Sequence, residues 1–435
     1  MAVYHNPADV LKTLIRFNTT NPPGNELACV QYIDGLLQAA GIETTILARD
    51  DNRPNLIARL PGNGTAPPFL MQGHVDVVTT ANQNWTHPPF DAVEADGFIW
   101  GRGALDMKSG VAMMLCAMLK MKAEGITPNG DIILCILSDE EASARYGAKW
   151  LVENHAEQFA GVKQAIGEFG GQSTYLAGKK FYLIQMAEKL SCQLRLSIHG
   201  SGGHGALLIR GGAMTRLGKL LTKLDKQHTP IHITPVVRMM IEGIVGATKA
   251  PTSNVLRQLL RPRLTDALMA TVPGLAAMRP MFRNTVSPTI VRGGDKINVI
   301  PSKIELDLDG RMLPGFTPEQ FMAELRPIIG KDIDINIIGY DVPNLNPPDT
   351  GQFDMLAGIL KELDPDGVPI PYMLPAISDG RFFSQLGIQT YGFTPMQLPK
   401  DFSFSATIHA ADERIPVEAM NFGTQAIFMA LQRYR

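Results

Sequence analysis

Acidic and histidine side chains stand in this sequence where apolar runs end, and these residue types act as metal ligands and as acid–base groups. The first pair is His74 and Asp76, near the end of the apolar run 69–78. Side chains two apart in a strand leave the same face, so Asp76 is placed to hold the second ring nitrogen of a metal-ligating His74. An ordinary strand-end turn is the alternative explanation of this pair.

A glycine-rich loop, 100–110, leads into a long apolar helix and carries Asp106 just before it. Asp106 is therefore a candidate metal ligand, and an N-cap of the helix is the alternative. The glycines of this loop match neither GxGxxG nor GxxxxGK, which argues against a phosphate-binding loop.

Further acids follow two other apolar runs. Asp139, Glu140 and Glu141 come directly after the run 132–137, and Glu168 ends a later short run. Acid clusters are usually solvated surface. These carboxylates, however, would cap buried strands and repel one another unless they shared a cation or a proton.

The pattern between residues 69 and 168 indicates the elements that would position these side chains. Short apolar runs alternate there with helical periodicity, which predicts βαβ units in a mixed, mainly parallel sheet with helices on both faces, an α/β fold. In such sheets, ligands bind at the carboxyl ends of the strands. The alternating segments are 69–78, 110–122, 132–137, 146–154 and 165–168.

The predicted sheet brings the candidate residues to one rim, where their negative charge would need compensation. The side chains expected there are His74, Asp106, Glu140, Glu141 and Glu168. Mixed histidine and carboxylate donors suit Zn²⁺ or a neighbouring first-row cation. A second histidine is expected to complete the set, and His409, in a polar loop near the end of the chain, is the best candidate of the nine histidines.

The pattern changes after about residue 188. Period-two alternation over 191–199 is typical of a half-buried strand in an antiparallel or mixed sheet. Residues 236–283 have no firm period, and prolines predict a linker over 341–351. These features predict a smaller α+β layer with an insertion near 236–283. Its further elements are expected at 213–224, 297–309, 316–329 and 332–338.

Composition excludes several classes of protein. Of 435 residues, 45% are hydrophobic and the formal net charge is -2, which argues against a disordered chain and against a nucleic-acid binder. No apolar run reaches the roughly 18 residues that cross a membrane. We expect no membrane association and no secretory signal. The four cysteines form no CxxC pair and indicate a reduced, cytoplasmic protein.

Five segments together resemble the M20 metallopeptidase family. They are GHVDVV, GRGALDMKSG, SDEEAS, EFGG and IHAADERI, in the order and at roughly the spacing of that family. The family includes aminoacylase, acetylornithine deacetylase, succinyl-diaminopimelate desuccinylase and glutamate carboxypeptidase. The resemblance implies a zinc-peptidase-like catalytic domain, residues 1–187 and 346–435, split by an inserted lid or dimerisation domain at 188–345.

Carried over residue by residue, the resemblance implies a site for two metal ions, Zn²⁺ with Co²⁺ or Mn²⁺ as alternatives. Asp106 would bridge the ions. His74 and Glu168 would be the other ligands of one ion, and Glu141 and His409 those of the second ion.

The same resemblance implies catalytic roles. Glu140 would be the general base that passes a proton from water to the leaving nitrogen, and Asp76 would orient His74. His204, in the glycine-rich loop 200–205, would stabilise the oxyanion, commonly from a partner subunit. A histidine without function in a flexible loop is the alternative.

Two lid residues, Asn298 and Arg311, match positions that grip a substrate carboxylate in the family. Arg311 shares a strand face with Asp307 and Asp309, so a plain surface ion pair is the alternative. The segment 379–381 resembles a further family segment near the site and is expected to support it structurally.

The implied activity is hydrolysis of an amide bond in an N-acyl amino acid or in a peptide with a free carboxylate, by a protein that dimerises through its lid. A dipeptidase or aminopeptidase-like enzyme is the alternative within the family. From another class, a non-catalytic binding protein could use the same fold. The presence of every metal ligand and of Glu140 favours an enzyme.

Overall fold

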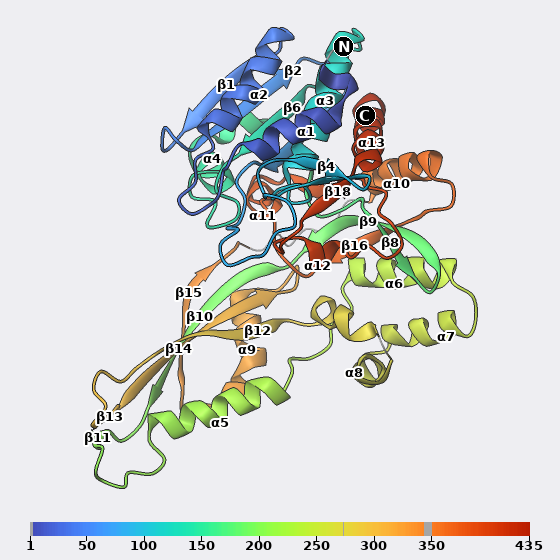
Figure 1. Ribbon diagram of the computed structural model, residues 1–435. Helices are drawn as coiled ribbons and strands as arrows, with labels where there is room; N and C mark the ends of the chain where they lie inside the picture. Colours follow the sequence, from blue (N-terminus) through green and yellow to red (C-terminus); the bar gives the residue numbers. More distant parts are fainter. Residues whose placement is uncertain (1–2, 273, 343–349) are drawn as a thin grey trace.

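The computed structural model describes residues 3–272, 274–342 and 350–435, and its larger part is built on a nine-stranded sheet (Figure 1). The strand order is β1-β2-β6-β3-β7-β17-β9-β16, with β8 paired to β9. The four central strands run parallel, whereas β2–β6 and β17–β9 are antiparallel. The strands are β1 (Glu43–Ala48), β2 (Pro54–Leu60), β3 (Phe69–His74), β6 (Ile132–Leu137), β7 (Gln164–Gly167), β8 (Ser173–Leu176), β9 (Lys179–Glu188), β16 (Val368–Leu374) and β17 (Gln389–Gly392).

Helices cover both faces of this sheet, as expected for the predicted α/β fold. One face carries most of the larger apolar core, and the other packs against α4 and α11. Strands β3 and β6 are buried at every position, which explains the continuous apolar sequence of β6 and the apolar first half of β3. The helices are α1 (Pro7–Arg16), α2 (Leu27–Ala39), α3 (Lys108–Ala123), α4 (Ala148–Asn154), α10 (Gly351–Leu363), α11 (Gly380–Phe383), α12 (Phe404–Thr407) and α13 (Val417–Arg433).

Helix α3 lies in the middle of the larger core. Thirteen of its 16 residues are buried, so it is apolar on all sides and not amphipathic. It packs against α13 and α1. Because the helix is held on every side, the loop that precedes it is fixed relative to the carboxyl ends of β3, β6 and β7. A small sheet of β4 (Val93–Ala95), β5 (Phe98–Trp100) and β18 (Arg414–Pro416) joins this loop region to the last part of the chain.

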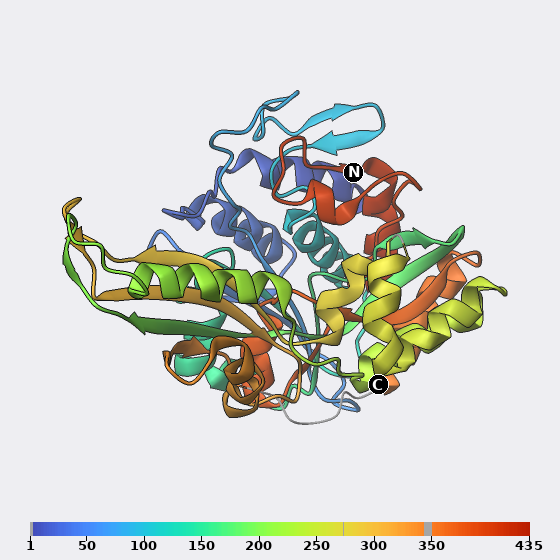
Figure 2. The same cartoon turned by 90° about the horizontal axis from the view of Figure 1, so that it is seen from below.

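A second, smaller core belongs to a four-stranded sheet that projects from the larger part as an arm (Figures 1 and 2). We call this arm the lid. Its strands lie in the order β12-β14-β10-β15 and are antiparallel, and two helices cover one face. The lid consists of β10 (Leu190–His199), β11 (Gly203–His204), α5 (Ala213–Lys226), β12 (Thr285–Arg292), β13 (Val299–Ile300), β14 (Lys303–Met312), α9 (Pro318–Ile329) and β15 (Asp334–Tyr340).

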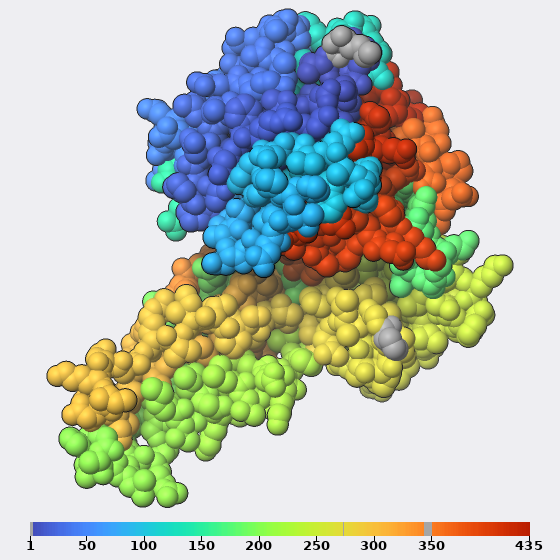
Figure 3. Space-filling model, viewed as in Figure 1, coloured from blue at the N-terminus to red at the C-terminus, as the bar shows by residue number. Residues whose placement is uncertain are grey.

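The segment between α5 and β12, expected as an insertion in the lid, is helical. Its apolar side chains belong to the larger core and not to the core of the lid, and α6 lies against the edge strand β16. The space-filling view shows this yellow segment directly below the larger part, beside the lid (Figure 3). The segment comprises α6 (Pro235–Ala247), α7 (Thr252–Arg257), η3 (Gln258–Leu260), α8 (Pro262–Thr271) and η4 (Leu275–Phe282).

The expected linker over 341–351 lies mostly outside the described residues. Within those that the structure describes, no helix combines the length and the apolar character that a membrane crossing needs. All four cysteines are buried and unpaired.

Gly170, in the turn that follows Glu168, tests how tightly this part of the sheet is packed. A Cβ atom at Gly170 would overlap the carbonyl oxygen of Gly392 and lie 2.9 Å from the amide nitrogen of Gln185. We expect Gly170→Ala to lower the free energy of unfolding by about 1–3 kcal/mol in a urea titration, because backbone must shift to admit it. Gly35→Ala, in helix α2 with nothing within 4 Å of the new atom, should be neutral or stabilising. Equal effects of the two substitutions would contradict this packing.

Candidate metal centre

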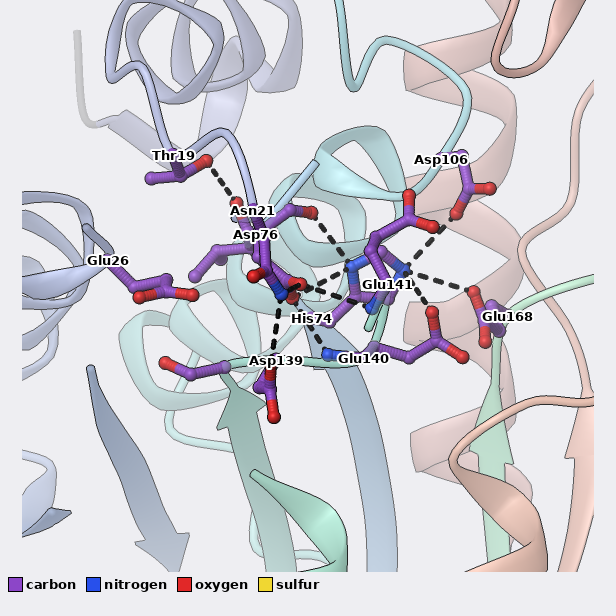
Figure 4. Close-up of polar contacts among 12 residues, drawn as sticks. Thr19, Asn21, Glu26, His74, Asp76, Asp106, Asp139, Glu140, Glu141 and Glu168 are labelled. Carbon is purple, nitrogen blue, oxygen red and sulfur yellow. Dashed lines mark hydrogen bonds and ion pairs between the residues drawn. The ribbon is translucent and has the colours of Figure 1, made fainter. Parts of the chain in front are cut away.

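Seven of the predicted site residues meet at the carboxyl ends of three parallel strands. Figure 4 labels six of them, all except His409. His74 is the last residue of β3, and Glu168 follows β7 directly. Asp106 lies in the loop before α3. The remaining members are Asp76 after β3, Glu140 and Glu141 after β6, and His409 in the loop between α12 and β18.

The ligand atoms form two groups that share Asp106. In the first, His74 Nε2 lies 3.2 Å from Asp106 Oδ1 and 3.2 Å from Glu168 Oε2. In the second, His409 Nε2 lies 3.2 Å from Asp106 Oδ2 and 3.2 Å from Glu141 Oε2. The atoms within each group lie within 4.8 Å of one another, so each group could surround one cation. One oxygen of Asp106 faces each group, which is the arrangement that a bridging carboxylate requires.

The chemistry of these donors fits divalent cations. Glu141 Oε1 and Glu168 Oε1 are buried and have no hydrogen-bond partner among the described residues. A buried carboxylate oxygen without a partner is costly, and these two oxygens belong to different ligand groups. Imidazole nitrogens combined with carboxylate oxygens suit Zn²⁺ and its first-row neighbours.

The two histidines compensate the acids through raised pKa values. Hydrogen bonds with Asp106 and Glu141 raise the pKa of His409 to about 10. For His74, burial disfavours the charged form, but hydrogen bonds with Asp106 and Asp76 raise its pKa well above the usual value. A cation that binds here would take the place of these protons, so metal binding is linked to proton release.

The acids of the centre have pKa values shifted in opposite directions. Burial raises the pKa of Glu168 to about 8, and burial together with the charge of Glu168 raises the pKa of Glu140 well above its usual range. Burial would also raise the pKa of Asp106, but hydrogen bonds with His409 and His74 lower it. Such divergence within one small site is typical of acid–base chemistry.

Glu140 stands beside the first ligand group but belongs to neither group. Its Oε2 atom lies 4.0 Å from His74 Nε2, beyond the 3.2 Å of the ligand contacts, and its side chain is 11% exposed. The neighbouring Glu141 contacts His409 instead. The two consecutive acids therefore have different positions, which follows from the turn after β6.

Asp76 is fully buried and connects three parts of the centre. Its backbone carbonyl oxygen lies 3.0 Å from His74 Nδ1 and its carboxylate lies 3.5 Å from the same atom, so the imidazole meets the backbone first. The two carboxylate oxygens also accept the backbone N–H groups of Glu140 and Glu141, at 3.1 Å each. One side chain thus orients the histidine and the acid-bearing turn together.

Residues that the sequence reasoning missed extend this support. Asn21 donates to Asp76 at 2.8 Å and to Asp139 at 3.0 Å, and Arg53 pairs with Asp139 and with Glu26. Asp139 therefore faces away from the ligand groups, although it precedes Glu140. Asn21 stands in a proline-rich turn more than fifty residues before Asp76, and nothing in its local sequence marks the contact.

A further acid, Asp379, lies in the segment 379–381 that was expected to support the site. It is 1% exposed, neither carboxylate oxygen has a hydrogen-bond partner in the described chain, and burial raises its pKa to about 7. Arg381 Nε lies 3.4 Å from Asp341 Oδ1, and the guanidinium donates to the carbonyl of Ser378. This segment joins the larger part of the protein to the end of the lid.

The three predicted lid residues lie apart from the ligand groups. His204 is exposed on β11, and Asn298 is exposed beside it, where its carbonyl accepts the N–H of Gly205. Arg311, on β14, makes a two-point contact with Asp309 at 3.0 and 3.1 Å. Within the described chain the structure brings together the candidate metal ligands, Glu140 and Asp76, and the roles of these lid residues stay predictions.

Comparison with known proteins identifies the family. Residues 70–433 match peptidase family M20/M25/M40, which is most of the chain, and the protein belongs to that family. Its members are metallohydrolases that act on amide bonds of N-acyl amino acids and peptides.

Individual relatives agree with this assignment. The chain is 26% identical over 379 residues to the N-fatty-acyl-amino acid synthase/hydrolase PM20D1 of Bos taurus, covering 84% of this chain and 74% of that protein. It is 32% identical over 271 residues to succinyl-diaminopimelate desuccinylase of Paracoccus denitrificans, covering 60% of this chain and 68% of that protein. Its fold is similar to that of an M20 family metallo-carboxypeptidase from Sulfolobus solfataricus, with a TM-score of 0.69, 16% identity and coverage of 98% and 99%.

Asp76→Asn is expected to weaken metal binding about 10- to 100-fold, which is the usual cost of losing a group that orients a ligand. The new NH₂ group would face at least one of the three N–H donors that Asp76 accepts. Competition with a chromogenic chelator measures the affinity. Asp307→Asn, in the lid, removes another carboxylate that is mostly buried and ion-paired, and serves as the control. Unchanged affinity in Asp76→Asn would show that the side chain does not support the centre.

Proposed function

We propose that this protein binds two divalent cations, with Zn²⁺ as the first choice and Co²⁺ or Mn²⁺ as alternatives. We propose that it hydrolyses the amide bond of an N-acyl amino acid or of a short peptide with a free carboxylate. The shared position of Asp106 between two ligand groups supports the two-cation site. The names of the curated relatives, an N-fatty-acyl-amino acid hydrolase and a desuccinylase, favour an N-acyl amino acid over a dipeptide. The buried, unpaired thiols agree with a cytoplasmic protein.

The position of Glu140 is the observation that carries the proposal. A general base must lie near the reacting water without being occupied as a metal ligand. Glu140 meets both conditions, because it lies 4.0 Å from His74 Nε2 and stands outside both ligand groups. Its raised pKa, caused first by burial, makes it able to hold a proton between two steps of a reaction.

Cations at such a site lower the pKa of water towards about 7 and polarise a carbonyl group. The residues of the chain supply the rest of the chemistry. Glu140 takes a proton from the attacking water and delivers it to the leaving nitrogen, so that the amine departs uncharged. Asp76 keeps the imidazole of His74 and the backbone of Glu140 in fixed positions throughout.

Residues of the lid complete the proposal. Asn298 and Arg311 would bind the substrate carboxylate. The two-point contact with Asp309 uses Nε and Nη2 of Arg311, so it fixes the orientation of the guanidinium and leaves Nη1 for such a contact. His204 would donate to the oxyanion, but β11 lies at the end of the lid that is far from β6 and α3 in the larger part (Figure 1). We therefore place His204 in the site of a second subunit, in a homodimer that forms through the lid. Exposed Ile290 and Val291 on the edge strand β12 agree with such a surface.

Glu140→Gln should abolish turnover while leaving nearly two cations per chain. Loss of a general base costs about 10²- to 10⁴-fold in kcat, and the amide keeps the size of the acid. Amine release from a panel of N-acetyl, N-succinyl and long-chain N-acyl amino acids and dipeptides identifies the assay substrate, and metal content is measured on the same samples.

Glu141→Gln is the matched control, because the neighbouring acid belongs to a ligand group and its loss should lower metal content. If Glu140→Gln lost metal together with activity, Glu140 would be a ligand and not the base. Preference for dipeptides across the panel would favour the dipeptidase alternative. A metal-loaded protein that hydrolyses nothing on the panel would favour a binding protein.

The trans role of His204 predicts complementation between two inactive chains. Co-expressed His204→Ala and Glu140→Gln chains should recover about a quarter of the wild-type kcat, since half of random dimers are mixed and each mixed dimer has one complete site. Each variant alone should stay at least about 10²-fold slower. Light scattering establishes the oligomeric state. A monomer, or mixed chains that are no faster than the single variants, would refute the arrangement.

A further inference from the structure

A buried ion pair lies behind the second ligand group, between residues that the sequence separates by more than three hundred positions. Arg102 Nη1 and Glu413 Oε2 are 2.5 Å apart, and the two side chains are 1% and 0% exposed. Both residues stand in the loops that carry metal ligands, Arg102 four residues before Asp106 and Glu413 four residues after His409. Within the part of the chain that the structure describes, neither side chain forms a hydrogen bond or ion pair with a side chain of either ligand group.

Glu413 holds the backbone of the bridging ligand. Its Oε1 atom accepts the N–H of Leu105 at 2.7 Å and the N–H of Asp106 at 3.1 Å. Hydrogen bonds to a carboxylate are stronger than neutral ones. The position of Asp106 at the start of α3 therefore depends on an acid from the other end of the chain.

Arg102 holds the backbone of the second histidine. Its Nη2 atom donates to the carbonyl oxygen of His409 at 3.2 Å and to Gln83 Oε1 at 2.8 Å. Gln83 Nε2 donates to the same carbonyl at 2.8 Å. His409 needs this support, because its φ of 61° lies in the left-handed region, which is uncommon for residues other than glycine. The ring of Trp85 covers the guanidinium of Arg102, and the ring centroid lies 5.1 Å from Arg102 Cζ.

The two ligand groups depend on this pair to different degrees. His74 and Glu168 are carried by neighbouring parallel strands, β3 and β7, and the sheet sets their separation. His409 lies in a loop, and its carbonyl oxygen accepts hydrogen bonds from Arg102 and Gln83. A change at Arg102 should thus move the second ligand group and leave His74 and Glu168 in place.

We propose that Arg102, Glu413 and Gln83 are positioning residues that set the affinity of the Asp106–Glu141–His409 group for its cation. The inference rests on the proposed two-cation site but not on the proposed reaction. It is tested by metal binding in the absence of any substrate, so a failure of the amide hydrolysis and a failure of this proposal are distinguishable.

The test is a stepwise titration of the metal-free full-length protein with Zn²⁺ by calorimetry, and with Co²⁺ by visible absorption. Arg102→Lys keeps a cation for Glu413 but lacks the second arm that reaches His409. We expect one of the two binding steps to lose about 10- to 100-fold in affinity, as for other groups that orient ligands. The other step should change less than about threefold, within the scatter of remote substitutions.

Two further variants keep the test decisive. Gln83→Ala removes one donor to the His409 carbonyl from a half-buried side chain and should act in the same direction, even if Arg102→Lys fails to fold. Arg195→Lys alters a two-point contact with Asp307 in the lid and should leave both steps unchanged. Equal weakening of both steps, or no weakening of either step in Gln83→Ala, would overturn the proposal.

Discussion

Burial of negative charge at one edge of a sheet is the constraint on which the rest of this structure depends. Five carboxylates, those of Asp76, Asp106, Glu140, Glu141 and Glu168, are at most 11% exposed around two histidines. Without cations, two protonated imidazoles and the raised pKa values of Glu140 and Glu168 reduce the charge. With cations, three of these acids, Asp106, Glu141 and Glu168, would serve as ligands. The buried acids thus need positive charge beside them, from bound protons or from cations. The surrounding residues hold the acids in position for it.

The support has two independent halves. On one side, Asp76 gathers the imidazole of His74 and the turn after β6, and Asn21 connects Asp76 with Asp139. On the other side, Arg102 and Glu413 pair with each other. Glu413 binds the backbone of the loop before α3, and Arg102 binds the backbone of the loop that carries His409. Each half joins segments that are distant in the sequence, so the ligand geometry is a property of the whole larger part and not of any single motif.

The sequence predicted the elements and residues whose signals are local. Strand β6 is apolar at each of its six positions because it is buried on both faces, and its predicted bounds agree with the structure. The candidate ligands His74, Glu141 and Glu168 could be predicted because each stands at the end of an apolar run and because parallel strands end at one edge. Asp106 and His409 were candidates because of the loops in which they stand. Strand β12 was missed, since most of its residues are exposed and leave no apolar period. Glu413 was missed because only the fold brings it to Asp106.

Packing between parts was also beyond the sequence. Helices α6 to α8 follow α5 of the lid in the chain, yet their apolar side chains join the larger core beside β16. The hydrophobic periodicity of a sequence indicates that a helix has an apolar face. It does not indicate which part of the protein that face packs against. The same limit applies to His204, which is exposed on β11 and whose Nδ1 atom accepts the backbone N–H of Ala206, two residues along the chain.

The place of β17 in the central sheet has a consequence for how the protein is made. This strand, residues 389–392, lies between β7 and β9, which both come from the first 188 residues. While the ribosome is still making the lid, β7 has an open edge and β9 has no neighbour on that side. The sheet closes only when the last fifth of the chain has emerged, and His409 follows β17 by fewer than twenty residues. Strand β17, which closes the sheet, and the candidate ligand His409 thus leave the ribosome almost together. A chain cut short after the lid has neither.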